Sequence, residues 1–204
     1  MRRDSISVDT RGGSGMLLVA AVLVTGVLLG ESTPPLDTWM VDHWYVEPGT
    51  GHARIATVVS GVGTLAVISA LVVALTALAL QHKRPRLWLR YLVLLTAGLA
   101  TVLLQMVFQR AGPPVTAQDW TYPSGHVVIM TAVAFTAVAA HAMTPSWSIV
   151  VTAVGTLGVL AVAASRVTLG EHYFIDVVAA AVATVGVGLL ATRALGLPGR
   201  RQHV

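Results

Sequence analysis

The sequence predicts an all-α, polytopic membrane protein with six transmembrane helices in one bundle. Of its 204 residues, 55% are hydrophobic and only 11% are charged, and the mean hydropathy is +0.75. A water-soluble domain of this length could not cover so much apolar surface with so few charges. Six apolar runs are long enough to cross a bilayer core of about 30 Å, which takes about 20 helical residues.

The apolar runs give the expected boundaries of the bundle. Arginines followed by an apolar run are also typical of a signal peptide, but no small-x-small cleavage site precedes Glu31, so we interpret the first run as a helix. With no internal repeat, residues 1–204 form one domain: a bundle over 12–195 between cytoplasmic tails at 1–11 and 196–204. The expected spans are 12–30, 55–80, 87–109, 126–143, 146–165 and 174–195.

Charge asymmetry predicts the orientation, with both termini in the cytoplasm. Ten of the thirteen basic residues then fall in cytoplasmic segments: Arg2, Arg3, Arg11, Lys83, Arg84, Arg86, Arg90, Arg193, Arg200 and Arg201. Seven of the nine acidic residues fall on the other side: Glu31, Asp37, Asp42, Glu47, Asp119, Glu171 and Asp176. Because the Lys/Arg bias sets topology, the basic charge is a topology signal and does not indicate a nucleic-acid partner. We expect a multi-pass protein of the cell inner (plasma) membrane.

Several polar residues are predicted to meet at the outer ends of spans three to six. Ionisable groups at membrane depth are costly and usually have a function. With this topology, residues far apart in the sequence approach one another at one face of the membrane. They are Arg110, His126, Arg166, His172 and Asp176.

Residues 165–176, SRVTLGEHYFID, contain a specific spacing. His172 and Asp176 are i and i+4, so on a helix they are neighbours on one face. A carboxylate there can fix the imidazole tautomer and leave the other ring nitrogen free to attack or to exchange a proton. Arg166 offers donors that suit phosphate oxygens. The alternative is an interfacial His–Asp pair beside an arginine that extends to lipid headgroups.

Residues 122–126, YPSGH, predict the start of a helix with an anion site. Pro123 suits the first turn, where a missing N–H costs nothing. Ser124 and Gly125 offer free backbone N–H groups at the positive end of the helix. His126 follows on the same turn, in position for proton transfer. The alternative is an ordinary helix start with one interfacial histidine.

The two segments together resemble the type 2 phosphatidic acid phosphatase superfamily, which includes bacterial acid phosphatases and vanadium haloperoxidases. Its second motif, PSGH, matches residues 123–126, and its third, S-R-x5-H-x3-D, matches residues 165–176 without a gap. Order and placement on the outer ends of spans four to six also match the membrane branch of the family. The resemblance covers the chain from span three onward by motif.

The first motif departs from the family pattern, which is Lys, six residues, then Arg-Pro. Here the region reads LLQMVFQRAGPP, and placing Pro113 on the motif proline puts Gln105 at the lysine and Gly112 at the arginine. Arg110 lies two residues earlier, where many members have an additional arginine, and we expect it to supply part of the lost phosphate contact. Gln105 and Gln109 are candidates for neutral hydrogen-bond donors or, alternatively, for interhelical contacts.

The resemblance implies a role for each site residue. His172 is the nucleophile that forms a phosphohistidine, Asp176 orients it, and His126 protonates the leaving oxygen. The family needs no metal, no cysteine is present to hold one, and we expect no cofactor. The expected phosphate-binding residues are Arg166, Ser124, Gly125, Arg110 and Gln105.

The expected function is hydrolysis of a lipid phosphate or diphosphate at the extracytoplasmic face. Candidate substrates are a polyprenyl diphosphate, a phosphatidic acid or a phosphatidylglycerol phosphate, with the lipid tail between helices. Two alternatives stay open: a phosphotransferase with the same phosphohistidine, and a non-catalytic binder of lipid phosphates whose first motif has decayed. A transporter is less favoured, because the spans lack paired interrupted helices. The sequence does not indicate an oligomeric state.

Overall fold

The computed structural model describes residues 10–83, 85–116, 118–140 and 145–197, and within these ranges it contains helices and loops but no strand. Most of the two predicted cytoplasmic tails therefore lies outside the described residues. The α-helices are α1 (Arg11–Leu29), α2 (Pro35–Trp44), α3 (Gly51–Val58), α4 (Thr64–His82), α5 (Pro85–Leu99), α6 (Leu104–Phe108), α7 (Gly125–Ala140), α8 (Pro145–Thr168) and α9 (Phe174–Ala194). A π-helix, η1 (Val59–Gly63), joins α3 to α4, and a 3₁₀ turn, η2 (Ala100–Leu103), joins α5 to α6.

Five helical segments are long and apolar enough to cross a membrane, which agrees with the predicted multi-pass architecture. They are Arg11–Leu29, Gly51–Gln81, Pro85–Phe108, Trp147–Thr168 and Phe174–Ala194. The predicted span 126–143 corresponds to α7, a shorter apolar helix of 16 residues, and its last part, 141–143, lies outside the described residues. The count of six spans and the N-in/C-in orientation therefore remain predictions.

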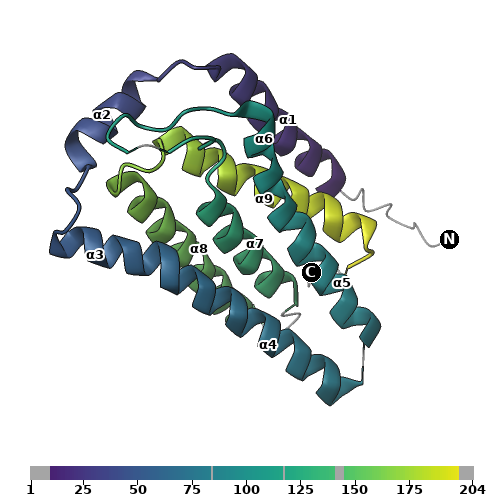
Figure 1. The fold of residues 1–204 in the computed structure, drawn as a ribbon. Coiled ribbons are helices and arrows are strands. Elements are labelled where there is room, and N and C mark those ends of the chain that lie inside the picture. The colour runs from purple at the N-terminus through teal and green to yellow at the C-terminus, as the bar shows by residue number, and fades with distance from the viewer. Residues whose placement is uncertain (1–9, 84, 117, 141–144, 198–204) are drawn as a thin grey trace.

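Helix α7 lies inside the bundle, where it packs against α4, α5, α8 and α9 (Figure 1). Its apolar residues are distributed around the whole helix, which is typical of a helix that is buried on all sides. Val127 and Val128 are fully buried and form a core cluster with Val162 of α8 and Val177 of α9. The start of α7 is thus fixed against the end of α8 and the start of α9.

Helix α1 packs closely along α9 through small residues. A Cβ atom on Gly15 would lie 2.8 Å from the carbonyl oxygen of Gly186, and one on Gly186 would lie 3.0 Å from that of Gly15. Both positions therefore need glycine for the two backbones to approach, as is common between membrane helices. This contact holds the N-terminal helix against the element that carries Asp176.

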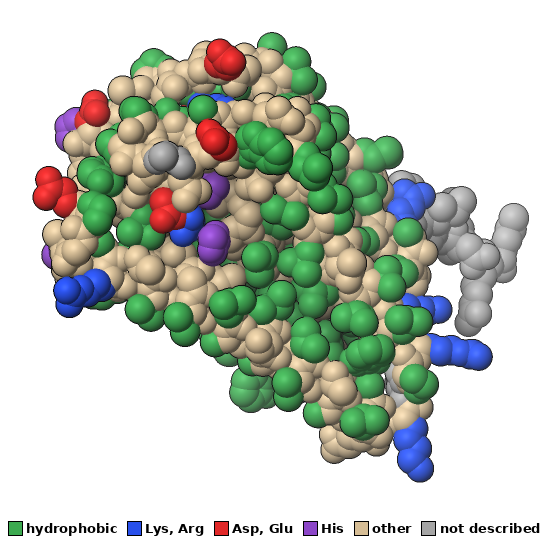
Figure 2. All heavy atoms as spheres, in the orientation of Figure 1, with side chains coloured by type: hydrophobic (Ala, Val, Ile, Leu, Met, Phe, Trp, Pro, Cys, Tyr) green, Lys and Arg blue, Asp and Glu red, His purple; other side chains and the backbone are tan. Residues whose placement is uncertain are grey.

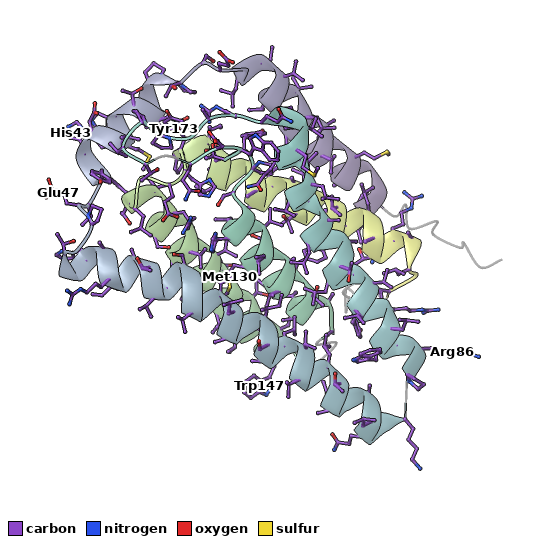
Figure 3. The ribbon with its side chains drawn as sticks, in the orientation of Figure 1. His43, Glu47, Arg86, Met130, Trp147 and Tyr173 are labelled. Carbon is purple, nitrogen blue, oxygen red and sulfur yellow. The ribbon has the colours of Figure 1, made fainter. Side chains whose placement is uncertain are left out.

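The two ends of the bundle differ in charge, and hydrophobic side chains cover its middle (Figure 2). Acidic and histidine side chains gather at the end that α2 covers, and most Lys and Arg side chains of this face lie at the other end. Figure 3 shows the same contrast: His43 and Glu47 lie at one end and Arg86 at the opposite end. Exposed apolar residues such as Leu65, Val150 and Leu157 lie on the outside of the spans, a pattern that suits contact with lipid.

Helix α2 is short and lies across the end of the bundle, where it contacts α8 and α9 (Figure 1). Its inward face is formed by Asp37, Met40 and Val41, and Met40 joins the core cluster around Val127. The chain after α2 is tied to the end of α8, because the backbone N–H of Val46 donates to the carbonyl oxygen of Thr168 over 2.9 Å. α2 therefore covers the end of the bundle at which the predicted site residues lie.

Candidate active site

The YPSGH segment forms a buried turn that leads into α7. The backbone N–H of Ser124 donates to the carbonyl oxygen of Asp176 over 3.1 Å, which ties the turn to the first turn of α9. The Ser124 side chain is fully buried, and its hydroxyl has no hydrogen-bond partner among the described residues. A buried unpaired hydroxyl costs free energy and calls for an explanation. A ligand oxygen at this turn would supply the missing partner.

Gln105 supports the same turn from α6. Its amide nitrogen donates to the carbonyl oxygen of Pro123 over 2.8 Å, and a Cβ atom on Gly125 would lie 3.7 Å from that nitrogen. The residue that replaces the motif lysine is therefore adjacent to the PSGH turn. One of its donors is engaged by the protein, so the predicted contact of Gln105 with phosphate stays a prediction.

His172 lies in the short connection between α8 and α9 and is buried. Its Nδ1 atom is 3.0 Å from the carbonyl oxygen of Thr121 and 3.9 Å from Oδ2 of Asp176. Because both neighbours are acceptors, the proton of the neutral ring belongs on Nδ1, and Nε2 keeps its lone pair. Burial, and secondly the charge of Arg166, lowers the pKa of His172 to about 3, so the ring is neutral near pH 7.

His172 and Asp176 do not share one helix, in agreement with the expected start of the last span at residue 174. α9 begins at Phe174, and Tyr173 before it has an extended backbone, with φ −73° and ψ 158°. Asp176 caps this helix start, because its Oδ2 accepts the backbone N–H of Tyr173 over 3.0 Å. The cap ends the helix before His172, but it still keeps the two side chains adjacent.

Arg166 lies at the end of α8 and is also buried. One terminal nitrogen lies 3.5 Å from the hydroxyl of Ser60 in the π-helical turn, and the other forms an ion pair with Glu171. Its Nε atom has no hydrogen-bond partner within the described part of the chain. Ser60 and Glu171 were not predicted as site residues. The sequence of the π-helix, VSGVG at 59–63, contains no signal that predicts this conformation. Single π-helical turns are nevertheless frequent at functional sites.

Arg110 lies beside Asp176, in the cluster of polar residues that the sequence predicts. α6 ends at Phe108, Gln109 has a left-handed backbone with φ 46°, and the Arg110 side chain that follows is buried. Its Nη1 atom is 2.6 Å from Oδ1 of Asp176, and its Nη2 atom is 3.0 Å from the carbonyl oxygen of Ser32. The guanidinium therefore has partners within the protein, and its expected contact with phosphate stays a prediction.

Asp37 was not predicted and is part of the same cluster. Its Oδ2 atom is 3.7 Å from Nη2 of Arg110, and its Oδ1 accepts the backbone N–H of Ile175 over 3.0 Å. The outer segment 31–54 contains several acidic residues and histidines of similar appearance, so no sequence signal distinguishes Asp37. Only its burial in the structure distinguishes Asp37 from these residues.

The predicted residues thus lie at one end of the bundle, where histidine, acidic and basic side chains are neighbours on the visible face (Figure 2). His126, the second residue of α7, is half-buried and close enough to His172 for the two rings to interact electrostatically. Gly112 is packed against Thr121: a Cβ atom there would lie 2.7 Å from Cγ2 of Thr121. Within the described residues, no three His, Asp or Glu side chains are grouped to hold a metal ion.

Comparison with known proteins supports the family resemblance. The fold matches the crystal structure described as the first transmembrane PAP2 type phosphatidylglycerolphosphate phosphatase from Bacillus subtilis, with a TM-score of 0.71 and 17% sequence identity. The match covers 93% of this chain and 99% of the other. A search of curated proteins found no match. The family model of the PAP2 superfamily matches residues 57–198, which is well over half of the sequence and includes both intact motifs, and the chain therefore belongs to the PAP2 superfamily.

Proposed function

We propose that this protein is an integral membrane phosphatase that hydrolyses a lipid phosphate or diphosphate through a phosphohistidine at His172. The observation that carries the proposal is the environment of that ring. Nδ1 faces two acceptors, the carbonyl oxygen of Thr121 at 3.0 Å and Oδ2 of Asp176 at 3.9 Å, so Nε2 is the nitrogen with a free lone pair. The ring is neutral near pH 7, as a nucleophile must be.

The reaction has two balanced steps. In the first, Nε2 of His172 attacks phosphorus, the bond from phosphorus to the leaving oxygen breaks, and His126 gives its proton to that oxygen. In the second, water attacks phosphorus, the P–N bond breaks, and His126 takes a proton from the water. The products are the dephosphorylated lipid and inorganic phosphate, and both histidines return to their starting states.

Charge on the phosphoryl oxygens needs donors that are already in place. Within the part of the chain that the structure describes, Nε of Arg166 and the hydroxyl of Ser124 have no partner, and the Gly125 amide is at the N-terminus of α7. Gln105 stands beside this turn and offers a neutral donor where the family has a lysine. The assignment of Arg110 to phosphate has less support, because Asp176 and Ser32 already engage it.

The substrate class follows from the position of this site in a membrane protein. The site lies at the end of apolar helices whose outer faces suit lipid tails, so a headgroup can enter while its tail stays in the bilayer. We infer that this end is extracytoplasmic, from the charge asymmetry of the sequence. The solved neighbour is named for a phosphatidylglycerolphosphate phosphatase, and such a lipid joins polyprenyl diphosphates and phosphatidic acids as a candidate.

Gln105 and Gly112 favour one alternative, a lipid-phosphate binder without catalysis. The two cations of the first motif are missing, and Arg166, the cation that we propose binds phosphate, is paired with Glu171. Removal of a single oxyanion donor costs about 3–4 kcal/mol in a well-studied protease. A site that lacks two cations therefore needs compensation from other donors to turn over at a useful rate.

One experiment separates hydrolysis, transfer and binding. Purified protein in detergent is incubated with ³²P-labelled lipid diphosphate, with and without an acceptor lipid, and is compared with His172→Ala, His126→Ala and the exposed control His43→Ala. Free labelled phosphate that disappears in the first two variants and persists in the control supports the proposal. Label on the acceptor supports a phosphotransferase. Retention of lipid without release of label would establish the binder.

A further inference from the structure

A buried charge cluster lies behind His172, on the side away from its free Nε2. It consists of Arg110, Asp176 and Asp37, with the carbonyl oxygen of Ser32 and the ring of Tyr173 against the guanidinium. The side chains of Arg110 and of the two aspartates are at most 3% exposed. Charges buried to this extent persist only where partners satisfy them, because the removal of an ion from water is costly.

The two carboxylate oxygens of Asp176 have separate partners. Oδ1 accepts Nη1 of Arg110 over 2.6 Å, a short charge-assisted bond. Oδ2 accepts the backbone N–H of Tyr173 over 3.0 Å and lies 3.9 Å from Nδ1 of His172. Arg110 therefore fixes the plane of the carboxylate from one side, which directs the other oxygen toward the histidine.

Arg110 is itself held by the segment before and within α2. Its Nη2 donates to the carbonyl oxygen of Ser32 over 3.0 Å and lies 3.7 Å from Oδ2 of Asp37. The Tyr173 ring covers the guanidinium carbon, 4.6 Å from the ring centroid, a cation–π geometry. Four partners from two separate segments of the chain, residues 32–37 and 173–176, thus surround the guanidinium.

Asp37 also connects α2 directly to α9. Its Oδ1 accepts the backbone N–H of Ile175, so one carboxylate from outside the helix satisfies a free donor in the first turn. Residues 32–37 lie outside the range 57–198 that the family model matches. The segment 32–37, which lies outside the matched region, therefore contacts Arg110, Arg110 contacts Asp176, and Asp176 lies beside His172.

We propose that Arg110 and Asp37 are positioning residues that hold Asp176 toward Nδ1 of His172, so that the segment 32–37 completes the site. The inference deepens the proposed phosphatase function and rests on it for its kinetic consequences. It assigns Arg110 to the carboxylate behind the nucleophile and leaves phosphate binding to Arg166 and the PSGH turn. A misplacement of about 1 Å at a reacting group can cost about 100-fold in rate.

The kinetic test compares kcat and KM for hydrolysis of a lipid phosphate in detergent. Arg110→Met should lower kcat about 100-fold and change KM less than threefold, because the phosphate ligands stay in place. Arg110→Lys should retain an intermediate kcat, and the exposed control Arg54→Met should behave as the wild type. A raised KM with a normal kcat in Arg110→Met would mean that Arg110 binds phosphate and would overturn the proposal.

Asp37→Asn tests the second positioning residue with little change in shape. It keeps an oxygen for Ile175 and removes the charge that faces Arg110, so we expect kcat to fall about tenfold with KM unchanged. If Arg110→Met fails to fold in detergent, Asp37→Asn and Arg110→Lys carry the test by the same criteria. Wild-type kcat in both of these variants would contradict the inference.

The tautomer of His172, measured by NMR, tests the inference independently of enzymatic activity. In ¹⁵N-histidine-labelled protein, the two ring-nitrogen shifts of His172, assigned with His172→Gln, report its tautomer. The wild type should show the proton on Nδ1, and Arg110→Met or Asp37→Asn should raise the Nε2–H fraction measurably. An unchanged tautomer in both variants would overturn the positioning role. If the wild type hydrolyses no lipid phosphate, the proposed function fails, while these shifts still decide whether the cluster orients His172.

Discussion

Two arginines at the same end of the bundle, each buried to a similar extent, have opposite surroundings. Arg166 is 7% exposed and Arg110 is 4% exposed. Arg166 has an Nε atom without a partner among the described residues, a long contact of 3.5 Å to Ser60 and an ion pair with the partly exposed Glu171. Arg110 has a carboxylate at 2.6 Å, a carbonyl oxygen at 3.0 Å and an aromatic ring against it.

The difference shows that burial and charge alone do not identify a phosphate ligand. What distinguishes the two arginines is whether their donors are already used within the protein. An arginine with a free N–H can bind a phosphoryl group without losing a bond, whereas one that holds a buried carboxylate would leave that carboxylate unpaired. Removal of one partner of such a pair is strongly destabilising. The two arginines therefore suit a ligand-binding role and a supporting role, respectively.

Replacement of Arg166 is the largest effect we expect. Arg166→Met removes the cation that we propose binds the phosphoryl group, so kcat/KM for a lipid phosphate should fall about 1000-fold, in line with the loss of a strong oxyanion donor. Inhibition by orthovanadate, an analogue of phosphate, should be lost at the same time. Arg110→Met should keep orthovanadate inhibition within threefold of the wild type. If the two variants lose it equally, the contrast between the arginines is wrong.

Restoration of a cation at the first motif should have the next largest effect. Gln105 stands beside the PSGH turn, 2.8 Å from the carbonyl oxygen of Pro123, so a lysine there can reach the same turn. Gln105→Lys should raise kcat/KM about tenfold, because a charged donor binds a phosphoryl oxygen more strongly than a neutral one. Gln109→Lys, at an exposed position one helical turn away, is the matched control and should have no such effect. A fall in kcat/KM would show that Gln105 is needed as it is.

The other lost cation of the motif cannot be restored in the same way. A Cβ atom on Gly112 would lie 2.7 Å from Cγ2 of Thr121 and 3.0 Å from the carbonyl oxygen of Gln118. The N–H of Gly112 also donates to that same oxygen over 2.9 Å. Gly112→Arg should therefore lower the free energy of unfolding by about 1–3 kcal/mol, a typical cost of overpacking, which a shifted thermal midpoint in detergent would reveal.

The sequence predicted the helices well because apolar length is a local property. The five helical segments long enough to cross a membrane begin and end within a few residues of the expected bounds, and their apolar composition agrees with a multi-pass architecture. The two intact motifs also identified the family, since their residue types and spacings are specific. Helix α2 was not predicted: a ten-residue helix with two acids and a histidine gives a weak apolar pattern.

The partners of the site residues could not be predicted, because they depend on contacts between distant segments. Asp37 and Arg110 are separated by 73 positions in sequence, and only the way α2 crosses the bundle brings them within 3.7 Å. Arg110 was expected at phosphate because family position was the only guide to its direction. Gln109, the residue just before Arg110, has a left-handed backbone with φ 46°. Glutamine rarely adopts this conformation, so the sequence did not predict it.

Removal of Glu171, the counter-ion of Arg166, should have a smaller effect, on the affinity for phosphate. Glu171 pairs with Arg166 and must give way, or share the guanidinium, when a phosphoryl group binds. Glu171→Gln should lower KM for lipid phosphate and the inhibition constant of orthovanadate several-fold, because no carboxylate competes or repels. The exposed control Glu47→Gln should leave both unchanged. If Glu171→Gln raises KM, the glutamate helps to orient Arg166 and does not compete with substrate.

The smallest effect concerns stability against acid and tests whether His172 is buried in its neutral form. Its pKa of about 3 lies below the ordinary value of 6.5, because burial and the charge of Arg166 disfavour the imidazolium. The unfolded chain therefore binds a proton that the folded chain does not, and stability should fall as the pH falls from about 6.5 toward 3. The groups near the ring are Thr121, Asp176, Arg166 and His126.

Between pH 7 and pH 5 the thermal midpoint of the wild type in detergent should fall by several degrees more than that of His172→Gln. Equal falls would mean that the ring can be protonated in the folded protein, in which case it would not be the free nucleophile that its two acceptor neighbours indicate.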